Sequence, residues 1–333
     1  MPFPFLRLPS LIQDNVLRLT GDFDRIVFSL ISKKSKNLVK HANTSLRKME
    51  WGLFDEPDSS YLEFTNRHIG FSIEELSAEE RENGERIQLV MNGHVYPALR
   101  TPTNIYMEDF ARPFRHSWKL IEEMTKHVLE ISRCDQFDLV ATTDSEDLFV
   151  FNYTHKFNLL MYSRETNDVP SSARLSDFLL RDLEITNELY FSLCPEDDYI
   201  YNGPLRMGIL SPFDDSFISL DAVLNMECRE ACLRSDWTDD RLNRFLKKWL
   251  SGGLQNLETC QFTAIDHFIN TYTLFEGIQT IPFSINNRPR RHTGDQSEGV
   301  DIRRSDGCLA TIEIVTGGVY PNELTFYVWK ELM

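Results

Sequence analysis

Apolar residues in the first 42 positions of the chain follow a helical pattern. They fill Ser10 to Leu19 too densely for one narrow stripe, which favours a helix that packs on two sides, one facing its own domain and one a partner. Leu8-Pro9 begins the segment, and proline suits a helix start because its missing N–H would have no partner there. Thr20-Gly21-Asp22 interrupts the pattern, with Asp22 as the candidate N-cap of the next helix.

Two more short helices are predicted after this interruption. Apolar residues recur at i, i+1, i+4 and i+5 in Ile26, Val27, Leu30 and Ile31. This spacing predicts an amphipathic helix, and a lysine-rich stretch with Leu38 and Val39 predicts a third one. Three short helices cannot bury all of this apolar surface among themselves. We therefore expect residues 1–42 to bind another protein.

Residues 43–110 combine polar stretches with short apolar runs. The polar stretch 41–60 predicts a tether into a second folded region. Strands are expected at 61–64 and 86–91, and the Asn92-Gly93 pair after the second is a strong hairpin signal. This region is predicted to be a tether followed by a small antiparallel sheet.

Residues 111–333 are predicted to form a larger α/β region. A helix is expected from 116 to 132, and strand-like runs follow at 137–140 and 148–151. Further along, antiparallel hairpin strands are expected at 300–304, 309–315 and 324–329. A basic loop precedes them, with Arg288, Arg290, Arg291 and His292. We interpret this loop as solvated, the alternatives being a nuclear localisation signal or a contact for acidic ligands.

The clearest helical face of the chain lies within 238–250. Its apolar residues are Leu242, Phe245, Leu246, Trp249 and Leu250. Thr238 is a candidate N-cap, and Gly252-Gly253 can end the helix with a left-handed residue. Strand-like runs at 231–233 and 257–262 flank it, so we expect a parallel, right-handed strand-helix-strand unit like that of a leucine-rich repeat.

Charge is distributed unevenly along the chain. The 333 residues carry a net charge of −16. Residues 1–42 hold seven Lys or Arg and three Asp, a charge of +4, so the remainder carries −20. An acidic body repels nucleic acid and anionic membranes, which argues against either as the main partner. Basic protein targets fit better, and a solvated acidic surface without a binding role is the alternative.

The apolar runs and the cysteines of the sequence indicate the cellular compartment and the prospects for a metal site. No run approaches the roughly 18 apolar residues of a membrane-spanning helix, and the first residues do not resemble a signal peptide. Six cysteines are spread out without paired CxxC spacing, at Cys134, Cys194, Cys228, Cys232, Cys260 and Cys308. Free thiols in a reducing compartment follow from this pattern. We expect an intracellular protein of the cytoplasm and/or nucleus, with no metal and no cofactor.

Motifs of common catalytic sites are missing. The sequence has no GxSxG, HExxH, GxxxxGK[ST] or GxGxxG pattern. Carboxylates gather at Glu196-Asp197-Asp198 and Asp214-Asp215, which we interpret as solvated turns, metal or acid/base chemistry being the alternative. His155 and His267 lie near aromatic residues and are interpreted as core or surface residues. We therefore expect a protein that is not an enzyme.

Residues near the N-terminus resemble an F-box of the nematode type. The resemblance rests on Leu8-Pro9, Val16-Leu17, the Asp22 break, Leu30-Ile31-Ser32-Lys33 and Leu38-Val39, in that order and spacing. The chain departs from many F-boxes in having no Trp within 33–36. Such proteins dock through the F-box onto a Skp-type adaptor and, through it, a cullin, as substrate-recognition subunits of ubiquitin ligases.

The resemblance implies which side chains meet the adaptor. They are Phe5, Leu8, Pro9, Ile12, Val16, Leu17, Ile26, Leu30, Leu38 and Val39. The residues that bind the target protein stay unknown.

Residues 215–265 resemble the F-box-associated type 2 domain that follows nematode F-boxes. That family has an Asp-Leu-Asn helix ending in Trp and Gly, which appears here as Arg241-Leu242-Asn243 with the acidic residue displaced to Asp240. The fold class expected is α+β, with an F-box (1–42), a tether and small sheet (43–110) and a target-binding region (111–333). The alternatives are a stand-alone interaction or structural protein and a hydrolase using Asp197, Asp198, Asp214 and Asp215.

Overall fold

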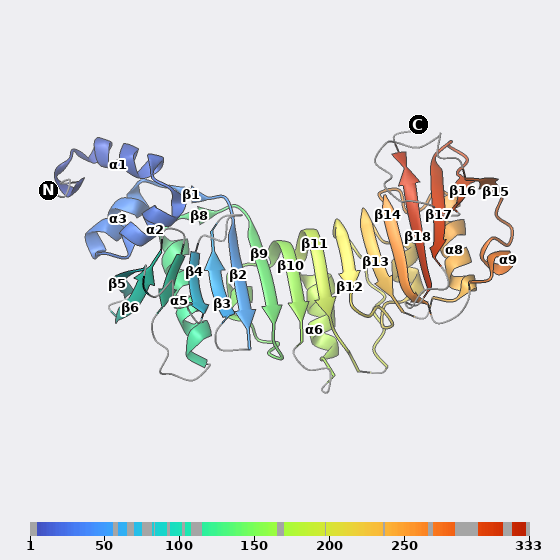
Figure 1. Cartoon of the computed structure of the whole chain (residues 1–333), viewed down its shortest axis with the longest axis horizontal. Coiled ribbons are helices and arrows are strands. Elements are labelled where there is room, and N and C mark those ends of the chain that lie inside the picture. Colours follow the sequence, from blue (N-terminus) through green and yellow to red (C-terminus); the bar gives the residue numbers. More distant parts are fainter. Residues whose placement is uncertain are drawn as a thin grey trace. The chain divides into compact units, whose positions relative to one another are not determined.

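Two compact units make up the chain in a computed structural model, Met1–Asn158 and Leu159–Met333 (Figure 1). The helix expected at 116–132 therefore belongs to the N-terminal unit, although we had grouped it with the region 111–333. The structure describes residues 5–55, 59–64, 70–74, 82, 84–91, 94–101, 104–107, 115–164, 170–196, 198–235, 237–265, 269–283, 299–315 and 322–330.

Four short helical elements open the N-terminal unit. They are η1 (Phe5–Arg7), α1 (Ser10–Leu19), α2 (Asp22–Ser29) and α3 (Lys33–His41). The bounds predicted for the first helix are confirmed. The N-cap of α2 is Gly21, so the prediction for Asp22 was wrong: Asp22 is the first helical residue, and its carboxylate pairs with Arg25 instead. The Ser32 hydroxyl caps α3 by accepting a hydrogen bond from the Ser35 N–H (3.1 Å).

Nine strands follow in the described part of the N-terminal unit. They are β1 (Ser45–Leu46), β2 (Met49–Phe54), β3 (Ser59–Glu63), β4 (Gly70–Glu74), β5 (Glu85–Met91), β6 (His94–Arg100), β7 (Asn104–Met107), β8 (Arg133–Cys134) and β9 (Phe137–Thr142). Seven of them lie in the order β9-β2-β3-β4-β7-β6-β5, and β1 pairs separately with β8. Strands β5 and β6 pair antiparallel, as the hairpin signal predicted, although Asn92-Gly93 lies outside the described residues.

The tether expected at 41–60 was wrong, because half of these positions lie in strands β1, β2 and β3. Met49, Trp51 and Leu53 of β2 are all fully buried. The charged residues beside them misled the prediction, because Lys48 forms ion pairs with Glu50 and Asp138, each at 2.7 Å, inside the fold. Helix α5 (Arg115–Ile131) covers this strand, where the Trp51 Nε1–H donates to Thr125 Oγ1 at 2.9 Å.

One further prediction in this unit was wrong. The run 148–151 is not a strand but the 3-10 helix η2 (Phe149–Asn152). Short apolar runs fit either kind of element, and only Val150 of this helix is fully buried.

The C-terminal unit is a sheet with helices interleaved along the chain. Its elements are β10 (Lys156–Ser163), in which the boundary between the units falls, α6 (Ala173–Asp177), the π-helical turn η3 (Phe178–Asp182), β11 (Glu184–Ser192), β12 (Ile209–Pro212), α7 (Leu220–Leu224), β13 (Glu230–Arg234), α8 (Asp239–Leu250), β14 (Thr259–Ile265), α9 (Thr271–Leu274), β15 (Thr280–Pro282), β16 (Gly299–Arg303), β17 (Leu309–Val315) and β18 (Asn322–Trp329). The strand order is β10-β11-β12-β13-β14-β18-β17-β16-β15.

The expected strand-helix-strand unit is present as β13, α8 and β14. The two strands are parallel, with Ala231 opposite Cys260. The Thr238 hydroxyl accepts a hydrogen bond from the Arg241 N–H, and Gly252 ends the helix at φ +90°. Strands β11 to β14 are all parallel in chain order, while the likeness to a leucine-rich repeat stays a prediction.

The expected C-terminal hairpin is also present. Strand β17 pairs antiparallel with both β16 and β18. Gly307, at φ +93°, allows the tight turn between β16 and β17. The basic loop with Arg288, Arg290, Arg291 and His292 lies outside the described residues.

Candidate functional site on the N-terminal helices

Helix α1 presents its apolar residues to solvent. The exposed fractions are 71% for Leu11, 45% for Ile12, 37% for Val16 and 88% for Leu19, and these four residues are called the outer face below. The side chains that α1 buries are Gln13 and Leu17. Scattered exposed apolar residues are ordinary on proteins, but several on one short helix indicate a binding surface.

Hydrogen bonds hold α1 in this orientation. The Gln13 Nε2–H₂ group donates to the carbonyls of Leu8 (2.9 Å) and Phe5 (3.2 Å), so an amide fills the inward side. The buried guanidinium of Arg25 donates to the Leu17 carbonyl at 3.4 Å, and burial lowers its pKa. Gln13 and Leu17 therefore face inward, and the four residues of the outer face are left in solvent.

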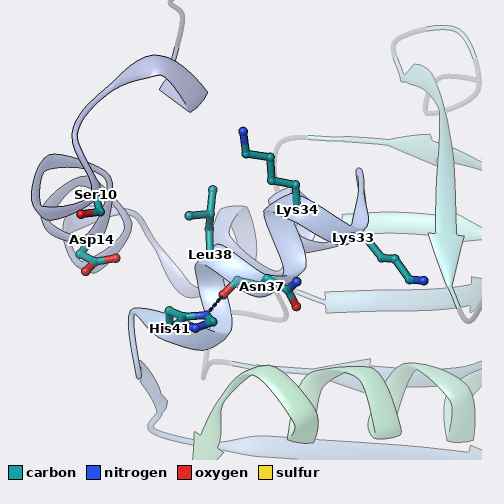
Figure 2. A pocket seen from close by; sticks show the side chains of 7 residues that line it. All are labelled: Ser10, Asp14, Lys33, Lys34, Asn37, Leu38 and His41. Carbon is teal, nitrogen blue, oxygen red and sulfur yellow. Dashed lines mark hydrogen bonds between the residues drawn. The ribbon is translucent and has the colours of Figure 1, made fainter.

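A pocket of about 540 Å³ opens between α1 and α3 (Figure 2). Its lining residues are Ser10 and Asp14 from α1 and Lys33, Lys34, Asn37, Leu38 and His41 from α3. In Figure 2, Leu38 rises from α3 between Lys34 and His41, and Asp14 lies across from it on α1. The His41 ring is fixed by its Nδ1, 2.6 Å from the Asn37 carbonyl oxygen. An apolar side chain next to the Lys34 ammonium group suits a partner segment with both apolar and acidic residues.

The ten residues expected to contact an adaptor fall into two groups. Ile12, Val16 and Pro9 are exposed, and Phe5, Leu8 and Leu38 are half-buried. The other four are core residues of this unit, with exposed fractions of 3% for Leu17, 1% for Ile26 and 0% for Leu30 and Val39. In this structure these four side chains pack inward, although the F-box resemblance assigned them to the adaptor.

Sequence reasoning missed other exposed apolar residues. Leu11 and Leu19 belong to the outer face, and Leu6 and Ile31 are 42% and 62% exposed. The signal was present in the excess of apolar residues on α1, which indicated two packed sides without showing which residues faced which way.

The N-terminal helices pack firmly on the strands and on α5. The Ser29 hydroxyl lies 2.8 Å from His127 Nε2, and Lys36 pairs with Glu130 at 2.6 Å. The backbone N–H of Val90 donates to the carbonyl of Leu30 at 3.1 Å, which joins this module to β5. Burial, aided by the nearby Lys36 cation, lowers the pKa of His127 to about 4, so this imidazole is neutral at neutral pH. No sequence pattern had singled out His127.

The carboxylates considered for hydrolysis have different surroundings. Asp198 is exposed, and Asp197 lies outside the described residues. Asp214 accepts a hydrogen bond from the Ser216 N–H at 2.8 Å, as in an ordinary turn. Asp215 is 1% exposed and accepts from Trp237 Nε1–H at 3.2 Å, and burial raises its pKa to about 6. Across the described ranges, no three His, Cys, Asp or Glu side chains gather as a metal site would require.

The remaining candidate groups can be placed as follows. His155 is exposed, and His267 lies outside the described residues. All six cysteines are free thiols, and burial raises the pKa of Cys228 to about 12 and that of Cys134 to about 11. Such thiols are poor nucleophiles at neutral pH. No helix in the described part of the chain is long and apolar enough to cross a membrane.

Comparison with known proteins identifies two regions. Residues 5–45 match the family described as F-box domain, which covers η1, α1, α2 and α3. Residues 204–262 match the family described as F-box associated, which covers β12, α7, β13, α8 and part of β14. No curated protein and no solved structure matches the chain. The chain thus carries an F-box domain followed by an F-box-associated domain, a combination of adaptor rather than catalytic type.

Proposed function

We propose that this protein is the substrate-recognition subunit of an SCF-type cullin-RING ubiquitin ligase. The F-box would bind a Skp-type adaptor and, through it, a cullin, and the C-terminal unit would hold a target protein. The observation that carries the proposal is the outer face, four solvent-exposed apolar residues on a helix within the region that matches an F-box domain. The proposed compartment is the cytoplasm and/or the nucleus.

The adaptor surface follows from exposure. It consists of the exposed and half-buried members of the expected set, together with the newly found Leu11 and Leu19. Burying a central apolar anchor at a protein interface commonly contributes about 2 kcal/mol or more. The pocket between α1 and α3 lies beside this surface and offers Leu38 to an apolar side chain of the adaptor and Lys34 to an acidic one.

The mechanism requires no catalytic side chain in this chain. Holding a target near a ubiquitin-charged enzyme raises the effective concentration of the target's lysines, which is how a scaffold accelerates transfer. The matches to two adaptor-type domains support this reading. The finer family, a nematode F-box protein with a leucine-rich-repeat-like body, belongs to the same proposal.

Co-purification with a Skp-type adaptor and a cullin tests the proposal. The full chain is expected to retain both proteins, and the double variant Ile12→Asp with Val16→Asp is expected to lose them, because charge on the outer face opposes its burial. Since both side chains are exposed, the variant should keep the urea midpoint of the parent.

A matched control separates the outer face from exposed apolar residues in general. Tyr272 and Val315, 91% and 59% exposed in the C-terminal unit, are changed together to Asp, and this variant should keep the adaptor. Failure of the parent chain to retain any adaptor would contradict the proposal and favour a stand-alone interaction or structural protein. Equal retention by the parent and the Ile12/Val16 variant would place the adaptor elsewhere.

A further inference from the structure

Strands β11 to β14 of the C-terminal unit have one buried face and one half-buried face. Leu189, Leu210, Ala231 and Cys260 lie in register across the four strands, and each is at most 5% exposed. Helix α8 packs on this side, where the rings of Phe245 and Phe262 lie 5.0 Å apart edge to face. Residues one position away point to the opposite side of the sheet.

The opposite side, called the open face below, carries half-buried polar and aromatic residues. One row runs Glu188, Ile209, Glu230 and Thr259, in register across the four strands. In the next row Tyr190 lies opposite Ser211, and Cys232 opposite Gln261. Tyr190, Ser211, Cys232 and Gln261 are likewise half-buried, so this side of the sheet is less buried than the side on which α8 packs.

Two carboxylates of this face flank an aliphatic residue. Glu188 and Glu230 sit two strands apart, roughly 10 Å, with Ile209 between them. The Tyr190 hydroxyl donates to Glu188 Oε2 at 3.1 Å, which fixes that carboxylate beside the ring. The pKa of Tyr190 is raised by burial and by both Glu188 and Glu230. Both carboxylates therefore lie close enough to Tyr190 to act on its hydroxyl.

Two neighbouring arginines, Arg229 and Arg234, neutralise the charge of Glu188 and Glu230 only weakly. Arg229 pairs with Glu230 at 3.1 Å, but both side chains are more than two-fifths exposed, where an ion pair is weak and readily exchanged. Arg234 is directed over the Phe213 ring, 5.3 Å from its centroid, and donates to Thr263 Oγ1 at 3.2 Å.

This arrangement matches the chemistry of a lysine or arginine side chain. A cationic head can sit between two carboxylates, its aliphatic stem can lie along Ile209, and the Tyr190 ring beside Glu188 adds an aromatic surface. An acidic or phosphorylated segment would be repelled. The charge of −20 outside residues 1–42 attracts basic segments from a distance as well.

We propose that the open face binds a basic segment of the target protein, with a Lys or Arg side chain over Ile209 between Glu188 and Glu230. The proposal rests on the proposed function, because it names the class of target that the substrate-recognition subunit would hold.

Fluorescence anisotropy with a labelled Arg-Gly repeat peptide tests this with the full chain alone. The double variant Glu188→Gln with Glu230→Gln should bind the peptide about fivefold or more weakly than the parent, because two ionic contacts are lost while shape is kept. Tyr190→Ala should also weaken binding, through loss of the ring. Peptide binding by the parent should fall as salt is raised.

A control of equal charge separates the open face from general acidity. Asp221→Asn with Glu276→Gln removes two exposed carboxylates elsewhere in the same unit and should bind the peptide like the parent. Equal weakening by this control, or unchanged binding by the Glu188/Glu230 variant, would overturn the proposal. If the double variant does not fold, as judged by thermal unfolding, the single change Glu188→Gln provides the same comparison.

Adaptor co-purification distinguishes this proposal from the proposed function. The Glu188/Glu230 variant should retain the Skp-type adaptor as the parent does, since all its changes lie outside the F-box. If the parent chain does not bind the adaptor, the ligase role is refuted, and the peptide-binding result still stands. Conversely, an adaptor-binding chain whose open-face variants bind the peptide normally would refute the open face alone.

Discussion

Helices α1 and α8 are both amphipathic, yet they use their apolar residues in opposite ways. Helix α8 buries Leu242, Phe245, Leu246 and Trp249 against the sheet of its own unit. Helix α1 buries an amide and one leucine and leaves the outer face in solvent. An apolar stripe in a sequence therefore predicts that a surface will be covered, but whether by the same chain or by a partner depends on what else the fold places against it.

The largest expected contrast comes from truncating one apolar residue on each helix. Trp249 is fully buried and its ring lies 5.4 Å from that of Phe326, so Trp249→Ala should lower the free energy of unfolding by about 3 to 5 kcal/mol. Leu19→Ala, at an exposed position, should change it by less than about 0.5 kcal/mol. Urea unfolding of both variants measures this. Similar losses for the two would show that Leu19 is covered within the chain.

A second contrast compares how two buried titratable groups, His127 in the N-terminal unit and Asp215 in the C-terminal unit, make stability depend on pH. His127 has its pKa lowered from 6.5 to about 4, so its contribution to stability is complete above pH 6.5 and is lost as pH falls towards 4. Asp215 has its pKa raised from 3.8 to about 6, so its contribution is complete below pH 3.8 and is lost as pH rises through 6. Acidification should therefore weaken the N-terminal unit and strengthen the C-terminal one.

Urea unfolding at pH 7 and pH 4.5 measures the two effects separately. In the parent, His127 should lower the free energy of unfolding by roughly 2 kcal/mol between pH 7 and pH 4.5, and Asp215 should raise it by a similar amount. The variants His127→Gln and Asp215→Asn should each lack the corresponding change. If both variants respond to pH as the parent does, these two groups do not titrate as their surroundings indicate.

The smallest contrast concerns one buried amide on each helix. Asn243 Nδ2–H₂ donates to the carbonyls of Leu274 (2.8 Å) and Glu276 (3.0 Å), as Gln13 does to two carbonyls before α1. Asn243→Ala and Gln13→Ala should each lower the free energy of unfolding by about 1 to 2 kcal/mol, because carbonyls lose their donors. Chemical denaturation checks this, with exposed Arg244→Ala as the control. A loss in the control as large as that of Asn243→Ala would contradict this role.

Sequence patterns predicted best where one element satisfies several rules together. Around α8, the Thr238 cap, the apolar spacing and the Gly252 ending all agree, and the structure confirms each of them. The bounds of α1 were predicted for the same reason. Strand β2 was missed because the charges of Lys48 and Glu50 suggested solvent, although Met49 and Trp51 already alternated with them.

The candidate site could be predicted only in part. The sequence indicated that the N-terminal helices carry more apolar surface than they can bury, but it assigned Ile26, Leu30 and Val39 to the partner. These residues are instead buried within the unit, where the Val90 N–H of β5 donates to the Leu30 carbonyl, and one sequence does not show such long-range contacts. The open face was not predicted either, since its row is assembled by strand register rather than by spacing along the chain.

The contacts between α2 and the rest of its unit have a consequence for how the F-box can be separated from the chain. Phe23 packs on Phe71 of β4 with ring centroids 6.2 Å apart, and Ser29 meets the buried His127. Removing residues 1–42 would take away the residues that cover Phe71 and His127. Apolar surface that is buried in the full chain would then be exposed to water. A shortened chain 43–333 should therefore be prone to aggregate. The F-box helices belong to the folded N-terminal unit and do not form a separate domain that can be removed without damage.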